Sequence, residues 1–346
     1  MSLNVSAPTL VVKGGVDVDS VLNTVTVVIY LLTVVLGLSG NSLVIWVAGF
    51  KLKPNVTNVW LVNLAVADLI FCLSRVLSLV KKLRYRDWPF GVFFCKFNGF
   101  FKYTNMFCSV FLLAVISLDR AVCVWRPVFT RQHRSVGAAR VVAAAVWAAA
   151  MAFSAPYFAY RQVYLGKRNE TKCSLEVKEA AAGDNAAKLA LYSIRFLCGF
   201  LLPFMVIFVC YILAGVGIRR MRLSGKSRTL RILASLVVAF FLCWAPYHCL
   251  LLAKMVNGKT LALDISLTLA KGLAYFNSCV NPLLYFFMGV GVRGCVRQSL
   301  AAACVRGLAG DDDGRSAERT VDDGSGSSAV RLNAAAAERA LGPRAP

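Results

Sequence analysis

Residues 22–50 read LNTVTVVIYLLTVVLGLSGNSLVIWVAGF, a long stretch without a charged side chain. A helix needs about 20 mostly apolar residues to cross a membrane, so this stretch is long enough to span one. Six more predominantly apolar stretches follow, at residues 56–80, 93–124, 141–158, 189–218, 232–255 and 261–288. The sequence therefore predicts a bundle of seven membrane-spanning helices.

The composition of the whole chain agrees with this prediction. Of its 346 residues, 58% are hydrophobic, and the mean hydropathy is +0.64. A soluble protein this apolar could not cover its surface with polar side chains. We expect an all-α integral membrane protein with four parts: an extracellular N-terminus at 1–21, the seven-helix bundle at 22–288, an amphipathic juxtamembrane helix at 289–304 and a disordered cytoplasmic tail at 305–346.

The formal charge of +22 would suggest a nucleic-acid partner in a soluble protein. Here the basic residues lie at helix ends and in loops, where they meet anionic lipid headgroups. We therefore expect membrane lipids as partners and no nucleic acid.

The orientation follows from the connection between the fifth and sixth stretches, which is strongly basic and has no acid. Its cationic residues, typical of a cytoplasmic loop, are Arg219, Arg220, Arg222, Lys226, Arg228 and Arg231. We therefore expect the N-terminus outside, in a multi-pass protein of the plasma membrane. The sequons at Asn4 and Asn169 would be extracellular, so both residues are candidates for glycosylation.

Most of the 12 cysteines lie inside apolar stretches, where cysteine behaves as a small hydrophobe. Cys95 and Cys173 instead lie at extracellular ends. That side of the membrane is oxidising, so we predict that they form a disulfide. Cys304 follows the amphipathic segment and is either a palmitoylation site or a reduced thiol.

Several polar residues fall inside the apolar stretches, where they are costly and therefore candidates for function. A carboxylate, Asp68, is accompanied by amides and hydroxyls in other helices: Asn105, Ser109, Asn277, Ser278 and Asn281. These oxygen atoms could bind a small cation, or they could form a hydrogen-bonded polar core that specifies packing.

Short motifs occur in order, one or two in each stretch: Gly40-Asn41, Leu64-Ala65-Val66-Ala67-Asp68, Asp119-Arg120, Trp147, Pro203 with Tyr211, Cys243-Trp244-Ala245-Pro246 and Asn281-Pro282-Leu283-Leu284-Tyr285. Through this set the chain resembles the class A (rhodopsin-like) G-protein-coupled receptors over about residues 25 to 304. The resemblance implies a receptor rather than an enzyme. It also implies partners in a heterotrimeric G protein of the inhibitory class and in arrestin.

The resemblance assigns further roles. The polar residues around Asp68 match the family's sodium site, so an allosteric sodium ion is possible. Other positions match the switch and the G-protein contact: Asp119, Arg120, Val128, Tyr211, Phe240, Trp244, Pro246, Pro282 and Tyr285. The family's aspartate–arginine–tyrosine triplet ends here in Ala121, and the inner end of the sixth stretch has no acid. We therefore expect Asp119 alone to hold Arg120.

Four cations lie in the outer halves of four stretches, on faces that point inward by helical spacing: Arg75, Lys102, Arg195 and Lys271. Each could extend to the outer membrane surface instead. If they converge, the bundle binds an anion, and arginine suits a carboxylate. Tyr103, Tyr247, His248 and Tyr275 would complete the ligand site.

Within class A the chain looks most like the chemoattractant receptors of the formyl-peptide, chemerin and complement-anaphylatoxin types. Segments such as Trp88-Pro89-Phe90-Gly91 and Asn105-Met106-Phe107 carry this likeness. The chemoattractant prostaglandin receptor is also similar. The formyl-peptide type has an aspartate where Tyr103 stands. The expected ligand is therefore an anionic peptide with a carboxylate end or, as an alternative, a carboxylate lipid. A third alternative is a scavenging receptor that does not signal.

Overall fold

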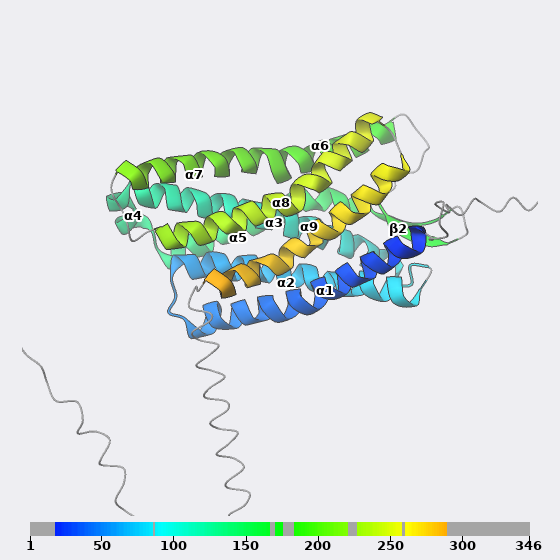
Figure 1. Ribbon diagram of the computed structural model, residues 1–346, viewed down its shortest axis with the longest axis horizontal. Helices are drawn as coiled ribbons and strands as arrows, with labels where there is room; N and C mark the ends of the chain where they lie inside the picture. The colour runs from blue at the N-terminus through cyan, green and yellow to red at the C-terminus, as the bar shows by residue number, and fades with distance from the viewer. Residues whose placement is uncertain are drawn as a thin grey trace, which may run out of the picture. The chain divides into compact units, whose positions relative to one another are not determined.

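The computed structural model describes residues 18–85, 87–166, 170–175, 183–220, 227–257 and 260–288. Helices account for most of these residues (Figure 1). In chain order the elements are α1 Val18–Trp46, the π-helical turn η1 Val47–Lys51, α2 Val56–Arg84, α3 Gly91–Trp125, α4 Pro127–His133, α5 Val136–Ala159, β1 Gln162–Leu165, β2 Thr171–Ser174, α6 Gly183–Phe196, η2 Leu197–Leu201, α7 Leu202–Arg220, α8 Ser227–Asn257 and α9 Leu261–Met288.

The predicted bundle of seven long helices is confirmed. Among the described residues, six helical segments are long and apolar enough to cross a membrane, with α6, η2 and α7 forming one continuous segment. The seventh, α9, has the length but a lower hydropathy, because it contains polar residues such as Asp264, Lys271 and Asn277. Its apolar face still packs against α1 and α8.

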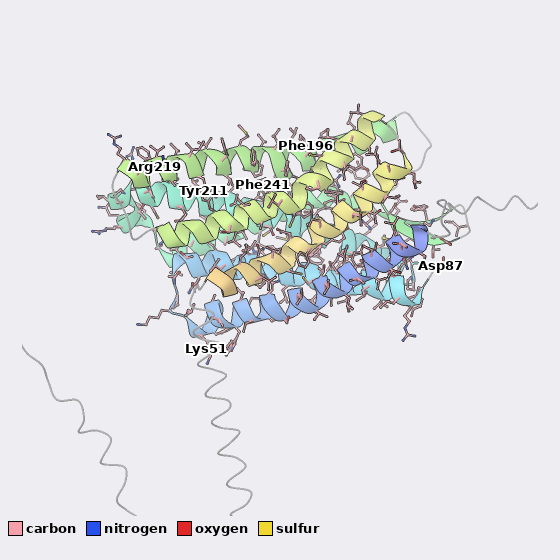
Figure 2. All side chains as sticks on the ribbon, viewed as in Figure 1. Lys51, Asp87, Phe196, Tyr211, Arg219 and Phe241 are labelled. Carbon is pink, nitrogen blue, oxygen red and sulfur yellow. A yellow bond between two sulfur atoms is a disulfide. The ribbon has the colours of Figure 1, made fainter. Side chains whose placement is uncertain are left out.

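The long helices run side by side, with α4 at one end of the bundle and β2 at the other (Figure 1). We call these the α4 end and the hairpin end. Lys51 and Arg219 lie at the α4 end, and Asp87 lies at the hairpin end (Figure 2). Helix α3 occupies the centre, because it packs against α2, α5, α7 and α8.

The distribution of side chains is that of a protein surrounded by lipid. Large apolar residues such as Phe208 and Leu242 face outward, with 52% and 66% of their surface exposed. Polar residues such as Asn41 and Asp68 are completely buried. Lipid cannot satisfy polar groups, so they turn toward the interior.

A two-stranded hairpin lies between α5 and α6, an element that the all-α expectation did not include. Strand β1 pairs antiparallel with β2, and Val163 stands opposite Cys173. The predicted disulfide between Cys95 and Cys173 is confirmed, with a Cα–Cα distance of 5.7 Å. It ties the hairpin to the start of α3. The Thr171 N–H also donates to Asp87 Oδ1 at 2.6 Å.

Several predicted features lie outside the described residues: the N-terminal segment before Val18, the glycosylation candidates Asn4 and Asn169, the juxtamembrane helix at 289–304, Cys304 and the tail at 305–346. Tyr285 lies in α9, but its side chain is outside the described part.

Close packing of α1 on α9 gives a test of the fold. A Cβ atom at Gly40 would lie 2.8 Å from Cβ of Pro282, whose ring cannot move aside. We expect Gly40→Ala to lower the stability by about 1–3 kcal/mol through overpacking, measured as a lower midpoint of thermal unfolding in detergent.

Gly215 provides the matched control. It also lies in a long helix, but a Cβ there would meet nothing within 4 Å. Gly215→Ala should leave the midpoint unchanged or raise it, because alanine favours helix. Equal midpoints for the two variants would contradict the close contact at Pro282.

Candidate functional site

The four predicted cations of the outer bundle lie close together in the structure. We call Arg75, Lys102, Arg195 and Lys271 the cationic cluster. The charge of Lys102 interacts with the charges of all three other members. Arg75 and Arg195 are buried, with exposures of 3% and 1%. Neither extends to the membrane surface, so the alternative of outward extension is wrong for these two arginines.

Aromatic rings join the members of the cluster. Lys102 Nζ lies 5.2 Å from the ring centre of Tyr275, and the Arg75 guanidinium lies 5.1 Å from the same ring. On the other side, Lys102 and Arg195 lie 5.9 and 5.2 Å from the ring of Tyr247. A ring face attracts a cation without neutralising its charge, so the rings hold the cluster together while it stays positive.

Arg195 lies at the end of α6, next to the π-helical turn η2. Its Nη1 donates to the hydroxyl of Tyr103 at 3.0 Å, and its guanidinium lies 4.9 Å from the ring of Tyr192. Its Nε and Nη2 are buried without a hydrogen-bond partner in the structure. Unpaired buried N–H groups on a charged side chain are costly. An anion would satisfy both.

Tyr103 is itself held in place from α5. Its ring stacks on Tyr157 with a centroid distance of 3.7 Å. The Tyr157 hydroxyl donates to the Leu191 carbonyl at 2.7 Å. Sequence reasoning missed Tyr157 and Tyr192, because aromatic residues in apolar stretches are usually packing residues.

Arg75 has more partners than Arg195. Its Nη2 donates to Oδ1 of Asn98, and it lies 4.9 Å from the ring of Phe71. Asn98 in turn donates to Ser78 Oγ at 3.3 Å. Residues of α2 and α3 therefore fix Arg75 in position. Its contribution to the site is its positive charge rather than free hydrogen-bond donors.

A fifth cation joins this region, and sequence reasoning missed it. Arg161 follows α5, and its Nε lies 3.2 Å from the sulfur of Cys173. A Cβ at Gly99 would overlap the Arg161 side chain, so glycine allows this close approach to α3. Burial lowers the pKa of Arg161 below its ordinary value. Its position in a short connection gave no sequence signal that it turns inward.

Nearby acids are engaged elsewhere. Asp264 pairs with Lys254, and Glu170 lies 3.6 Å from Lys172. Within the described ranges of the chain, no carboxylate forms an ion pair with a member of the cationic cluster. The site therefore has an excess of positive charge.

Deeper in the bundle lies the predicted polar core. The carboxylate of Asp68 accepts hydrogen bonds from Asn105 at 2.9 Å and from Asn281 at 2.7 Å. Asn41 donates to the backbone carbonyl of Ser278 at 2.9 Å. Other polar atoms of this core, Ser109 Oγ and Asn277 Oδ1, are buried without a partner. These two free oxygen atoms lie among the residues predicted for a cation site.

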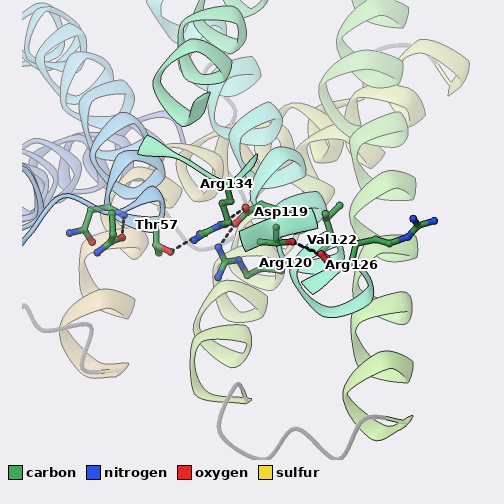
Figure 3. Close-up of polar contacts among 9 residues, drawn as sticks. Thr57, Asp119, Arg120, Val122, Arg126 and Arg134 are labelled. Carbon is green, nitrogen blue, oxygen red and sulfur yellow. Dashed lines mark hydrogen bonds and ion pairs between the residues drawn. The ribbon is translucent and has the colours of Figure 1, made fainter. Parts of the chain in front are cut away.

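The α4 end contains an ionic centre (Figure 3). Asp119 pairs with Arg120, as expected. It also accepts from Arg134 Nε at 2.8 Å and from Arg134 Nη2 at 3.2 Å. Burial by itself lowers the pKa of Arg134, but the hydrogen bond and the charge of Asp119 outweigh this, and the pKa lies above its ordinary value. Asp119 is therefore shared between Arg120 and Arg134, a second partner that the sequence did not reveal.

Comparison with known proteins identifies the framework that holds these sites. Residues 40–285 match the family described as 7 transmembrane receptor (rhodopsin family). The chain belongs to this family of receptors. The predictions of a class A receptor rather than an enzyme, and of a multi-pass membrane protein, are thereby confirmed.

Similar curated proteins cover nearly the whole chain. Formyl peptide receptor 2 of Mus musculus is 36% identical over 331 residues, which is 92% of this chain and 94% of the relative. The fMet-Leu-Phe receptor of Homo sapiens is 37% identical over 328 residues, covering 90% and 93%. The C3a anaphylatoxin chemotactic receptor of Danio rerio is 42% identical over 287 residues, covering 82% and 77%. The predicted likeness to the formyl-peptide and anaphylatoxin types is confirmed.

In this class A receptor two predicted switch residues, Phe240 and Trp244, belong to a continuous series of ring contacts, which we call the stack. Phe240 stacks on Trp244 with a centroid distance of 6.0 Å. The Trp244 ring lies 6.1 Å from both Tyr247 and His248. His248 stacks on Phe200 of η2 at 4.8 Å, and its Nε2 is buried without a partner. The stack leads from the neighbours of Arg195 toward the middle of the receptor.

The other predicted coupling positions lie in α7, α8, α9 and α4. Pro246 and Pro282 lie inside α8 and α9. Tyr211 lies in α7, and Val128 lies on α4 with 69% of its surface exposed. An exposed apolar residue on this short helix is available to a partner protein.

The position of Arg75 can be tested through Asn98. Asn98→Ala removes the acceptor and leaves a buried charge short of a partner. We expect a loss of about 1–3 kcal/mol, seen as a lower midpoint of thermal unfolding. Asn98→Asp keeps an acceptor and adds an opposite charge, so it should retain the midpoint. If Asn98→Ala unfolds like the unmodified receptor, the rings, Ser74 Oγ and the backbone carbonyl at position 98 are enough to hold Arg75.

Proposed function

We propose that this receptor detects an extracellular anionic chemoattractant, a peptide with a carboxylate end, and signals through an inhibitory-class G protein. The relatives whose names state a ligand or a response are receptors for formyl peptides and for the C3a anaphylatoxin. Their similarity extends over most of the chain, which supports a chemoattractant role in inflammation. Arrestin would act as a second intracellular partner.

The proposal of an anionic ligand rests on the burial of Arg195 and on its unpaired N–H groups. This arginine is 1% exposed and has two N–H-bearing atoms, Nε and Nη2, without partners. A carboxylate accepts two parallel hydrogen bonds from one guanidinium. Lys102 and Lys271 would add attraction from the same region, and Tyr103, Tyr247, His248 and Tyr275 would surround the ligand.

The ligand is proposed to enter from the hairpin end. The disulfide between Cys95 and Cys173 lies there and suits an oxidising exterior. The basic last turn of α7, with Arg219 and Arg220, lies at the opposite end (Figure 2) and suits the cytoplasm. This orientation in the plasma membrane leaves Asp119 and Arg120 facing the G protein.

We further propose that the polar core binds a sodium ion. Asp68 would supply the charge, and Ser109 and Asn277, which have unpartnered oxygen atoms, would supply ligands. Hard cations prefer such oxygen ligands. An ion here would neutralise a carboxylate that is otherwise buried among amides.

A carboxylate lipid and a scavenging role remain the competing functions. Suppression of cAMP in transfected cells, with and without pertussis toxin, separates them when the cells are exposed to chemoattractant peptides and to eicosanoids. A toxin-sensitive response to peptides supports the proposal. A response to eicosanoids alone favours the lipid ligand. Uptake of ligand with no response favours scavenging.

The role of Arg195 predicts how the receptor distinguishes an acid from its amide. An active peptide with a free carboxylate should be about 10- to 100-fold more potent than its C-terminal amide, the range expected for a charged hydrogen bond. In Arg195→Gln this difference should disappear, because the glutamine has no charge. The measurement is the potency ratio for cAMP suppression.

Lys82→Gln is the matched control, since it removes one positive charge from the last turn of α2, outside the cationic cluster. It should keep the potency ratio of the unmodified receptor. A ratio that survives in Arg195→Gln would place the carboxylate elsewhere.

The sodium proposal has a separate test. Raising sodium chloride against an equal concentration of choline chloride should lower agonist affinity in the unmodified receptor. Asp68→Asn should abolish this dependence, because the neutral amide cannot compensate the charge of the ion. Sodium dependence that persists in Asp68→Asn would contradict binding in the polar core.

A further inference from the structure

A groove of about 290 Å³ lies at the α4 end, and no described residue of α8 or α9 is part of its lining. Its walls come from α2, α3, α4 and α5. Apolar side chains such as Trp60, Leu118, Phe129 and Val142 form most of the lining. The volume is roughly ten times that of a water molecule in the liquid, so the groove can hold several methylene groups.

The groove opens toward the surface that lipid covers. Leu118 on α3 and Val142 on α5 lie in spanning helices and are 52% and 40% exposed. Phe129 on α4 is 53% exposed. These apolar surfaces face neither another helix nor the core. An acyl chain can therefore enter the groove from the membrane.

The lining also includes polar and charged groups. Arg134 and His133 lie there, together with Asp119. The carboxylate of Asp119 is already paired with Arg120 and Arg134. The hydrogen bonds of Arg134 leave from Nε and Nη2, and its guanidinium has two more N–H groups on Nη1.

The surroundings of these groups are uniformly basic. Residues 126–140, which contain α4, read RPVFTRQHRSVGAAR and include no acid. Arg126, Arg131 and Arg140 are exposed. Positive side chains near a membrane surface attract anionic headgroups by about 1 kcal/mol each. An apolar groove with basic groups beside it matches a molecule with an apolar chain and an anionic head.

We infer that this groove binds an anionic phospholipid of the cytoplasmic leaflet, with part of one acyl chain between α3, α4 and α5 and the anionic headgroup on Arg134. The leaflet follows from the orientation proposed above. The two parts of the site are complementary to the two parts of the lipid. A zwitterionic lipid would fill the groove equally well but would gain less from the basic groups.

The test is native mass spectrometry of the full-length receptor in detergent, with phosphatidylserine and phosphatidylcholine that carry identical acyl chains. Phosphatidylserine should bind at least tenfold more tightly. Arg134→Gln should weaken phosphatidylserine about tenfold, which is the effect of losing about 1.4 kcal/mol. Arg131→Gln removes the same charge from the same segment but does not line the groove, and it should change the affinity less than twofold.

The acyl chain has its own test, which does not disturb Asp119. Ala138 lines the groove at the start of α5, so Ala138→Phe should fill the space and reduce phosphatidylserine binding about tenfold. Ala145→Phe adds the same ring to an exposed position on α5 outside the groove and should have no effect. Glycerophosphoserine, which lacks acyl chains, should not displace the lipid.

Three results would overturn the proposal. Equal losses in Arg134→Gln and Arg131→Gln would indicate unspecific attraction to a basic surface. Unchanged binding in Ala138→Phe would show that the chain does not enter the groove. Displacement by glycerophosphoserine would show that the site recognises the headgroup alone. Each result is independent of the identity of the extracellular ligand.

Discussion

Lipid offers no hydrogen bonds, so each polar side chain on a spanning helix has to find its partner inside the bundle. Asp68 shows the consequence at the centre of the receptor. It is completely buried, and its two oxygen atoms accept hydrogen bonds from Asn105 on α3 and Asn281 on α9. One carboxylate thereby connects three helices. The apolar faces of the same helices remain outside, where lipid covers them.

The two ends of the bundle satisfy this constraint in different ways. At the α4 end a carboxylate serves the inward-facing arginines, because Asp119 pairs with both Arg120 and Arg134. At the hairpin end Arg75 and Arg195 are buried without a carboxylate among the described ion pairs. Such an imbalance is expensive in a receptor without ligand. It is the property from which the proposal of an anionic ligand follows.

Aromatic rings make this excess of positive charge tolerable. Tyr103, Tyr247 and Tyr275 each face two members of the cationic cluster. A carboxylate in their place would neutralise the cations and compete with the ligand. A ring stabilises a cation by a smaller amount and leaves its charge available. The tyrosines also place the cations directly beside the stack that contains Trp244.

Hydropathy along the chain was sufficient to predict seven helices. The last predicted stretch, residues 261–288, has the same bounds as the observed helix α9. The pairing of Cys95 with Cys173 also followed from sequence, since few cysteines lie outside the apolar stretches. Arg134 and Arg161 were different. Both lie in connections, and their partners became visible only when α4 and the hairpin folded back on α3. Whether a helix spans the membrane depends on the hydropathy of its own residues, so the sequence by itself determined the seven helices. The partner of a charge depends on distances between segments far apart in the chain, which only the tertiary structure decided.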